Sequence, residues 1–197
     1  MLTEPIRVTL LVVEALNGLD IPYFVGGSLA TAVHGVARAT LDVDLIADVR
    51  AEHAQPLVDA LGPDFYADTA MIRDAVRGRS SFNVIHKPTM FKVDVFIPKG
   101  RPFDRSQFAR RVAHSLTEGG ADVIYIASPE DNILAKLQWY RLGGEVSDRQ
   151  WRDVLNVIRI QGARLDRPYL YGGASELGVA DLLEEALDQS DSESVIG

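Results

Sequence analysis

The most constraining feature of the sequence is a strand, a glycine turn, a helix and a second strand within residues 21–48. The run IPYFV at 21–25 is short, apolar and bounded by turn residues, which predicts a buried strand. A Gly-Gly-Ser turn at 26–28 leads into a helical pattern at 29–36, for which its serine is a plausible N-cap. The run VDLIAD at 43–48 predicts a second strand. This alternation predicts a mixed α/β domain.

The hydrophobic pattern continues this layout to about residue 127. Strands at 80–87 and 90–98 are joined by a short proline-containing connection and predict an antiparallel hairpin, and another strand is expected at 123–127. Apolar positions at helical spacing predict helices over 4–17, 51–61, 69–77 and 104–115. The fold class expected for this part is therefore α/β (α+β), with a mixed sheet and flanking helices.

The pattern after residue 127 is helical. Ser128 and Ser147 have the spacing of N-caps for two helices, and a last helix is expected over 174–188. We therefore divide the chain into an α/β core at 1–127, a helical C-terminal part at 128–188 and an acidic tail at 189–197. The tail is expected to be disordered because it is polar and lies at the end of the sequence.

Two aspartates one residue apart lie in the second strand. Asp42 and Asp44 flank Val43, and successive strand side chains alternate faces, so both carboxylates point the same way. Carboxylates this close repel, and their pKa values rise unless a cation lies between them. Oxygen ligands without His or Cys favour a hard cation such as Mg²⁺ or Mn²⁺. In a chain with 28 acids, however, such a pair alone leaves a purely structural role open.

A third aspartate and the glycine turn give this pair a context. Asp94 lies on the polar face of the strand at 90–98, where an acid is costly unless it is paired or binds metal. Three such carboxylates can hold two Mg²⁺ ions about 3.5–4 Å apart. Glycines let a phosphate approach the backbone, and a helix N-terminus attracts anions. Together these features predict a site for a metal ion and a triphosphate.

The order of these features resembles the signature of the polymerase-β-like nucleotidyltransferase superfamily. More narrowly, GGSLATAVHGVARATLDVDL at 26–45 is similar to AbiEii-type toxins and related small bacterial nucleotidyltransferases. That group often carries an Arg-x-Thr before the acids, here Arg38 and Thr40. In SPEDNILAKLQWYR and RQWRDVLNV, a Lys and an Asp match the helical part of that group; by position these are Lys136 and Asp153. The resemblance covers about residues 20–188 and implies a nucleotidyltransferase-type sheet.

The resemblance also implies an activity, the transfer of a nucleoside monophosphate from an NTP to an acceptor hydroxyl. Asp42 and Asp44 would bind Mg²⁺ or Mn²⁺ together with the triphosphate. Asp94 would complete the metal site and act as base toward the acceptor. Catalysis of this kind depends mainly on positioning and charge neutralisation.

The resemblance assigns the remaining site residues to the nucleotide. Those implied for nucleotide binding are Gly26, Gly27, Ser28, Arg38 and Thr40. Lys136 would neutralise triphosphate charge, and Asp153 would orient Lys136 or the nucleotide. Structural alternatives stay open: Lys136 can extend along its helix to solvent, and Asp153 can pair with Arg149 one turn earlier. Arg38 can be a surface residue or pair with an aspartate.

The charge is unevenly distributed and bears on possible partners. The chain carries a net charge of −8, yet ten of its 20 Lys and Arg residues lie within 73–111 beside only three acids. This basic segment surrounds Asp94 and fits a polyanionic acceptor such as tRNA or another RNA, although a solvated face is the alternative. A protein or small-molecule acceptor also stays open, as does a toxin with a cognate antitoxin protein.

A second class of function competes with the enzyme. The chain can be a catalytically silent protein of the same fold that binds a nucleotide or a partner protein.

There is no cysteine, which excludes disulfides and thiolate chemistry. No apolar run reaches the roughly 18 residues of a membrane span. We therefore expect a cytoplasmic protein that does not act in the membrane.

Overall fold

The computed structural model describes residues 4–36, 42–115 and 123–194. The chain forms two compact units. The first, the sheet unit, comprises Met1–Gly26 and Ala39–Ile126, and the second, the helical unit, comprises Gly27–Arg38 and Ala127–Gly197. In the described ranges, no helix is long and apolar enough to cross a membrane.

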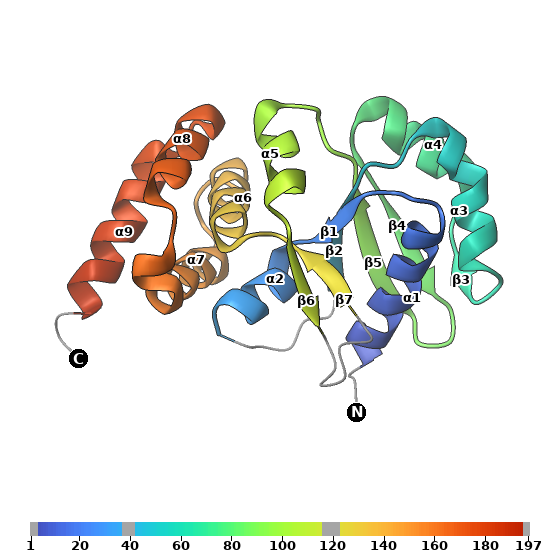
Figure 1. Ribbon diagram of the computed structural model, residues 1–197, viewed down its shortest axis with the longest axis horizontal. Helices are drawn as coiled ribbons and strands as arrows, with labels where there is room; N and C mark the ends of the chain where they lie inside the picture. The colour runs from blue at the N-terminus through green and yellow to red at the C-terminus, as the bar shows by residue number, and fades with distance from the viewer. Residues whose placement is uncertain (1–3, 37–41, 116–122, 195–197) are drawn as a thin grey trace. The chain divides into compact units, whose positions relative to one another are not determined.

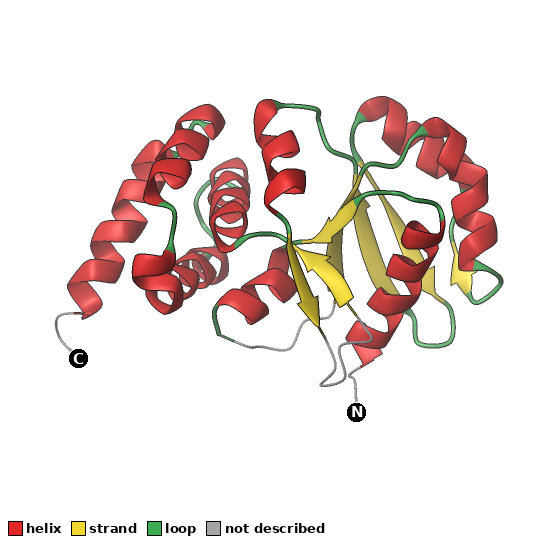
Figure 2. Ribbon diagram, viewed as in Figure 1, coloured by secondary structure: helices red, strands yellow, loops and turns green. Residues whose placement is uncertain are grey.

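The sheet unit is built on a mixed sheet with seven strands in its described part, in the order β3-β4-β5-β2-β1-β7-β6 (Figures 1 and 2). The strands are β1 Tyr23–Val25, β2 Asp42–Ala47, β3 Phe65–Tyr66, β4 Ser81–His86, β5 Phe91–Phe96, β6 Val112–Ser115 and β7 Val123–Ile126. Strand β2 pairs with β5 in parallel, and β1 with β7 in parallel. The predicted hairpin is confirmed, because β4 and β5 pair antiparallel. The predicted mixed α/β fold is confirmed as well.

One face of the central strands forms the core of the sheet unit. Alternate residues of β2 and β5 are fully buried, namely Val43, Leu45, Val93 and Val95. The helices of this unit are α1 Glu4–Gly18, η1 Ala51–His53, α3 Ala54–Leu61, α4 Thr69–Gly78 and α5 Pro102–Arg110. Helix α1 packs on β2 and β5, α4 packs on β4, and α3 contacts both helices (Figure 1). The strict alternation of buried and partly exposed residues therefore leaves the opposite face of β2 and β5 for other roles.

In its described part, the helical unit consists of helices without any strand. They are α2 Gly27–His34, α6 Pro129–Leu142, α7 Asp148–Gln161, η2 Gly162–Arg164, α8 Arg167–Leu177 and α9 Ala180–Ser194. Helix α6 packs against α2, α7 and α8, and α9 packs against α7 and α8. The N-caps predicted at Ser128 and Ser147 are confirmed. Ser128 Oγ accepts a hydrogen bond from the amide of Asp131 at 3.1 Å, and Ser147 Oγ accepts one from the amide of Gln150 at 3.4 Å.

Helix α2 is held in this unit by polar contacts that lie far apart in the sequence. The buried Asn132 side chain donates to Thr31 Oγ1 at 3.0 Å. His34 Nε2 donates to the carbonyl of Ala127 at 2.7 Å, and Gln161 donates to the carbonyl of His34 at 2.7 Å. These bonds fix both the side and the end of the helix that follows the glycine turn.

The helix predicted over 104–115 is too long at its end. Helix α5 ends at Arg110, and residues 112–115 form β6, which pairs antiparallel with β7. Arg111, between the two elements, lies over the ring of Tyr125 at 4.5 Å from its centroid. Pairing with β7 therefore overrides the local helical pattern.

The end of the chain also differs from the expectation. Two helices, α8 and α9, replace the single helix predicted over 174–188, and Gly178 separates them with a φ of +69°. Helix α9 continues to Ser194, so residues 189–194 are helical where disorder was expected. The side chain of Gln189 accepts a hydrogen bond from Trp151 Nε1 at 2.9 Å, and Ser190 is buried. These contacts explain why the polar sequence stays helical.

Candidate functional site

The three predicted aspartates lie on one face of the sheet unit. In the parallel pair, Asp44 stands opposite Asp94, and Asp42 stands opposite Lys92. Asn83 of β4 is opposite Asp94 on its other side. Neighbours in register share a face of a sheet, so these side chains form a polar patch across three strands. The three aspartates are partly exposed, whereas Val43, between Asp42 and Asp44, and Val93, between Lys92 and Asp94, are buried.

Lys92 brings a positive charge into this patch. Its Nζ lies 2.7 Å from Asp94 Oδ2, and 44% of the lysine side chain and 18% of the aspartate side chain remain exposed. The hydrogen bond to Asp94 raises the pKa of Lys92, partial burial opposes this, and the charges of Asp94, Asp42 and Asp44 add to the increase. All three carboxylates therefore act on a single ammonium group. The sequence places Lys92 on this face without giving it a role.

A divalent metal ion fits the donor set of this patch. The ammonium of Lys92 stands in for a cation, since it is held by one carboxylate and attracted by the other two. Among the residues that the structure describes, no three acidic or histidine side chains are arranged to hold an ion by themselves. Mg²⁺ does not need such a cage, because it commonly takes one or two carboxylates together with phosphate oxygens of a substrate.

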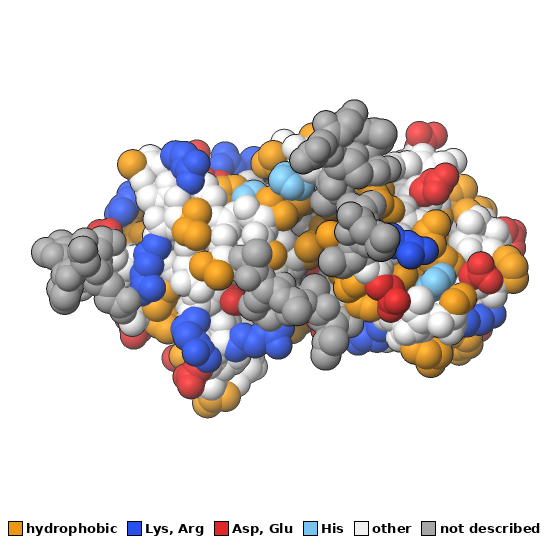
Figure 3. Space-filling view, turned by 90° about the horizontal axis from the view of Figure 1, so that it is seen from below, with side chains coloured by type: hydrophobic (Ala, Val, Ile, Leu, Met, Phe, Trp, Pro, Cys, Tyr) orange, Lys and Arg blue, Asp and Glu red, His pale blue; other side chains and the backbone are white. Residues whose placement is uncertain are grey.

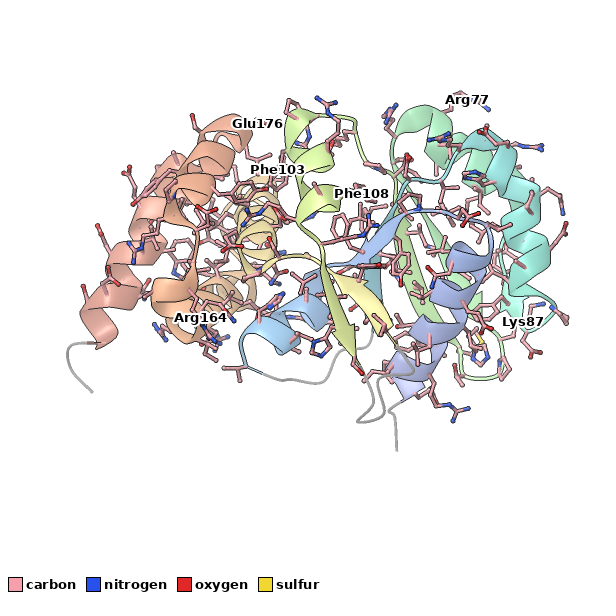
Figure 4. The ribbon with its side chains drawn as sticks, in the orientation of Figure 1. Arg77, Lys87, Phe103, Phe108, Arg164 and Glu176 are labelled. Atoms are coloured by element: carbon pink, nitrogen blue, oxygen red, sulfur yellow. The ribbon has the colours of Figure 1, made fainter. Side chains whose placement is uncertain are left out.

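Gly26 and the apolar part of this face hold β2 in place beside the patch. The amide of Gly26 donates to the carbonyl of Asp44 at 2.9 Å. A Cβ at Gly26 would lie 2.9 Å from Cδ1 of Ile46, so any other residue here would require the Ile46 side chain to move. Phe24 packs edge-on against Phe108 of α5, with 5.1 Å between ring centroids (Figure 4). Asp42 and Asp44 therefore project from a strand whose backbone is hydrogen-bonded to the glycine turn.

The helical unit carries a second group of predicted residues at the start of α2. Gly27 is the first residue of this helix and has a φ of +54°, a conformation that favours glycine. Ser28 lies inside the first turn, not at the N-cap as the sequence predicts. Ser28 is a buried residue, and its hydroxyl accepts a hydrogen bond from Arg149 Nη2 at 3.2 Å. An arginine and the free amides of a helix N-terminus are groups that bind anions.

Lys136 of α6 and Asp153 of α7 are in direct contact. Nζ lies 2.9 Å from Oδ2, and the side chains are only 10% and 7% exposed. An ion pair this deeply buried is maintained only when both charges are satisfied. Arg149, which the sequence offers as an alternative partner for Asp153, donates to Ser28. The sequence did not identify Arg149 as a site candidate. The signal that could have found it is its spacing, four residues before the predicted site residue Asp153 on the same helix.

The predicted site residues thus fall into two sets. Gly26 and the three aspartates belong to the sheet unit, and Gly27, Ser28, Lys136 and Asp153 belong to the helical unit. Arg38 and Thr40 lie outside the described residues. On α7, Arg149, Arg152 and Arg159 are exposed. Figure 3 shows groups of basic side chains on the face of the helical unit that it draws.

The fold, a mixed sheet with flanking helices, is similar to that of solved structures that include a nucleotidyltransferase-like protein. Antibiotic-resistance factor ANT(2'')-Ia is similar over 98% of this chain and 100% of its own, with a TM-score of 0.54 and 13% identity. An antigenic nucleotidyltransferase-like protein from Paracoccidioides brasiliensis is similar over 91% of both chains, with a TM-score of 0.52 and 21% identity. No protein-family model and no curated protein matches the sequence.

Proposed function

We propose that the chain is a metal-dependent nucleotidyltransferase that moves a nucleoside monophosphate from an NTP to an acceptor hydroxyl. The acceptor oxygen bonds to the α-phosphorus, the bond between that phosphorus and its bridging oxygen breaks, and pyrophosphate leaves. The observation that carries the proposal is the alignment of Asp42, Asp44 and Asp94 on one face of β2 and β5. The nucleotidyltransferase fold of the chain supports it.

The carboxylates would hold the ion and manage the proton of the reaction. Asp42 and Asp44 would bind Mg²⁺ or Mn²⁺ together with the phosphates, because hard cations prefer such oxygen ligands. The chemistry that the bound ion supplies is neutralisation of the phosphate charge and activation of the acceptor oxygen. Asp94 would complete the ligand set and accept the proton of the acceptor hydroxyl, which it releases to water after the transfer.

Residues of the helical unit would act on the triphosphate. The amide of Gly27 and the hydroxyl of Ser28 would donate to phosphate oxygens, with Arg149 beside them. Lys136 would neutralise phosphate charge, and Asp153 would keep the ammonium of Lys136 in position. We include the amide of Gly26 and the side chains of Arg38 and Thr40 in the nucleotide-binding set because of the sequence resemblance.

We propose AbiEii-type toxins as the nearest functional relatives, because an Arg-x-Thr precedes the acids and a Lys and an Asp follow in the helices. On this model the acceptor is RNA, with tRNA tested first, or a protein, and a cognate antitoxin would block the reaction. The similar structure ANT(2'')-Ia is an antibiotic-resistance factor. Antibiotics are therefore the small molecules to test as acceptors.

The test is label transfer by the purified chain. The chain is incubated with each α-³²P-labelled NTP, Mg²⁺ or Mn²⁺ and one acceptor class at a time: total tRNA, a protein extract or a set of antibiotics. We expect one class to retain the label in the presence of the metal, and EDTA to abolish retention. Because Asp42 and Asp44 are proposed to bind the metal, we expect label transfer by the Asp42→Asn, Asp44→Asn double variant to fall by at least about a hundredfold.

Asp74→Asn is the matched control. Asp74 is an exposed aspartate of the sheet unit that pairs with Arg77, so its variant should transfer label like the wild type. Retained transfer by the double variant would refute the assigned carboxylates. If no acceptor is labelled although the chain binds an NTP or a partner protein tightly, the catalytically silent alternative is correct.

A further inference from the structure

The ammonium of Lys92 lies beside Asp94, at the position that a metal ion bound to the aspartates of the polar patch would occupy. It lies two residues before Asp94 on the same face of β5 and directly opposite Asp42 in the parallel pair. Its ammonium approaches Asp94 Oδ2 to 2.7 Å. No other Lys or Arg occurs in β2, β4 or β5, the three adjacent strands that form the patch. The three aspartates therefore have a counter-ion built into the sheet.

We propose that Lys92 is an intrinsic competitor of the metal ion, which the ion displaces from Asp94 and which thereby sets the metal affinity of the site. The inference rests on the proposed function. An ammonium and a divalent ion cannot both bind the same oxygen of Asp94 at close range, because their charges repel. The stem of Lys92 is flexible and its side chain is partly exposed, so the ammonium can leave without rearrangement of the strand.

This competition has a consequence for the order of binding. A metal ion alone gains the carboxylates but must break the ion pair of Lys92 with Asp94. A metal ion that arrives with a triphosphate brings further oxygen ligands, and the released ammonium of Lys92 gains phosphate oxygens as new partners. The site therefore binds metal weakly when empty and more strongly with a nucleotide. Until then, Lys92 balances part of the negative charge of the patch.

The test is the affinity for Mn²⁺, measured by the electron paramagnetic resonance signal of the free ion without nucleotide and with α,β-methylene-ATP. Lys92→Met removes the ammonium but keeps most of the stem. We expect this variant without nucleotide to bind Mn²⁺ between about threefold and about thirtyfold more tightly than the wild type. The lower value corresponds to the small stabilisation that a partly exposed ion pair provides. The upper value corresponds to the Coulomb repulsion between the ammonium and the divalent ion at about 4 Å in water.

Two variants control for other effects. Lys92→Arg keeps the positive charge and should bind Mn²⁺ like the wild type. Lys99→Met removes an exposed positive charge of the same unit, beyond the end of β5, and should also leave the affinity unchanged. Structural damage by Lys92→Met would weaken Mn²⁺ binding, whereas the proposal predicts stronger binding. The direction of the change therefore separates the two causes.

The outcomes also separate this inference from the proposed function. If the wild type binds Mn²⁺ and Lys92→Met binds it equally well or less well, Lys92 does not compete and the inference is overturned. If neither protein binds Mn²⁺, with or without the nucleotide analogue, the metal site itself is refuted and the proposed function fails with it. Tighter binding by Lys92→Met, which disappears when Asp94→Asn is added to both proteins, supports the inference.

Discussion

Lys136 and Asp153 form a buried ion pair whose partners can be removed one at a time. Their charged atoms are 2.9 Å apart, and less than an eighth of each side chain is exposed, at 10% and 7%. Lys136→Met leaves the buried carboxylate of Asp153 without its lysine. The loss of one partner of a buried pair typically costs about 3–5 kcal/mol, so the free energy of unfolding should fall by about that amount. The melting temperature should fall by roughly 6–20 °C.

Replacing both charges should separate stability from function. In the double variant Lys136→Met, Asp153→Leu, two apolar side chains of similar volume fill the space of the pair, and such replacements are often neutral or stabilising. We therefore expect most of the lost stability to return. Nucleotide binding should not return, because the ammonium proposed to meet the triphosphate is absent. A lost charge-assisted hydrogen bond predicts binding about tenfold weaker or more.

Two measurements are needed. Unfolding in urea is monitored by tryptophan fluorescence, and NTP binding is measured by equilibrium dialysis. Trp139 and Trp151 lie in the two helices that carry the pair, so the fluorescence reports on the relevant unit. A Lys136→Met variant within about 1 kcal/mol of the wild type would refute the buried pair. A double variant that binds NTP like the wild type would refute the role of Lys136, whatever its stability.

Two further predictions concern the helical unit. Gly172→Ala and Gly173→Ala in α8 are a matched pair: a Cβ at Gly172 meets no atom within 4 Å, whereas one at Gly173 would lie 2.5 Å from Cδ1 of the buried Leu134. Urea unfolding should show the first variant more stable by about 0.4–1 kcal/mol and the second less stable by about 1–3 kcal/mol, and an equal effect would contradict the packing of α8 on α6. The hydrogen bond from Arg141 lowers the pKa of Asp181, so their stabilising interaction is present above the usual aspartate pKa of 3.8 and is lost as the pH falls through the lowered value. Thermal unfolding of the wild type and Asp181→Asn should therefore differ at pH 5 and converge toward pH 2.5, and a difference independent of pH would refute the pair.

The face that carries the acids could be predicted because strands have a strict period of two. That period places Asp42 with Asp44 and sets Asp94 apart from its apolar neighbours without any knowledge of the sheet. The contact between Lys92 and Asp94 depends on rotamers, and the influence of Asp42 on Lys92 depends on the parallel register of β2 and β5. Strand order and register arise from pairing between distant segments, which a local pattern does not contain.

The errors also occur where distant contacts override local preference. Residues 112–115 have a helical pattern but gain backbone hydrogen bonds from β7. The polar residues after 188 stay helical because Gln189 accepts a hydrogen bond from Trp151 and Ser190 is buried. The contact of Arg149 with Ser28, 121 positions apart, exists only because α2 packs beside α7. Short-range signals were more reliable: the N-caps at Ser128 and Ser147 were predicted correctly, whereas the one at Ser28 was not.

The most direct test of the central claim compares two positions of the label in one NTP. We expect the wild type to transfer ³²P from the α-position to the acceptor and to release ³²P from the γ-position as pyrophosphate. Asp94→Asn keeps the shape of the side chain and should reduce both signals by about a hundredfold or more, because it removes a metal ligand and the proton acceptor. Transfer of the γ-label to the acceptor, or undiminished α-label transfer by Asp94→Asn, would contradict nucleotidyl transfer at these carboxylates.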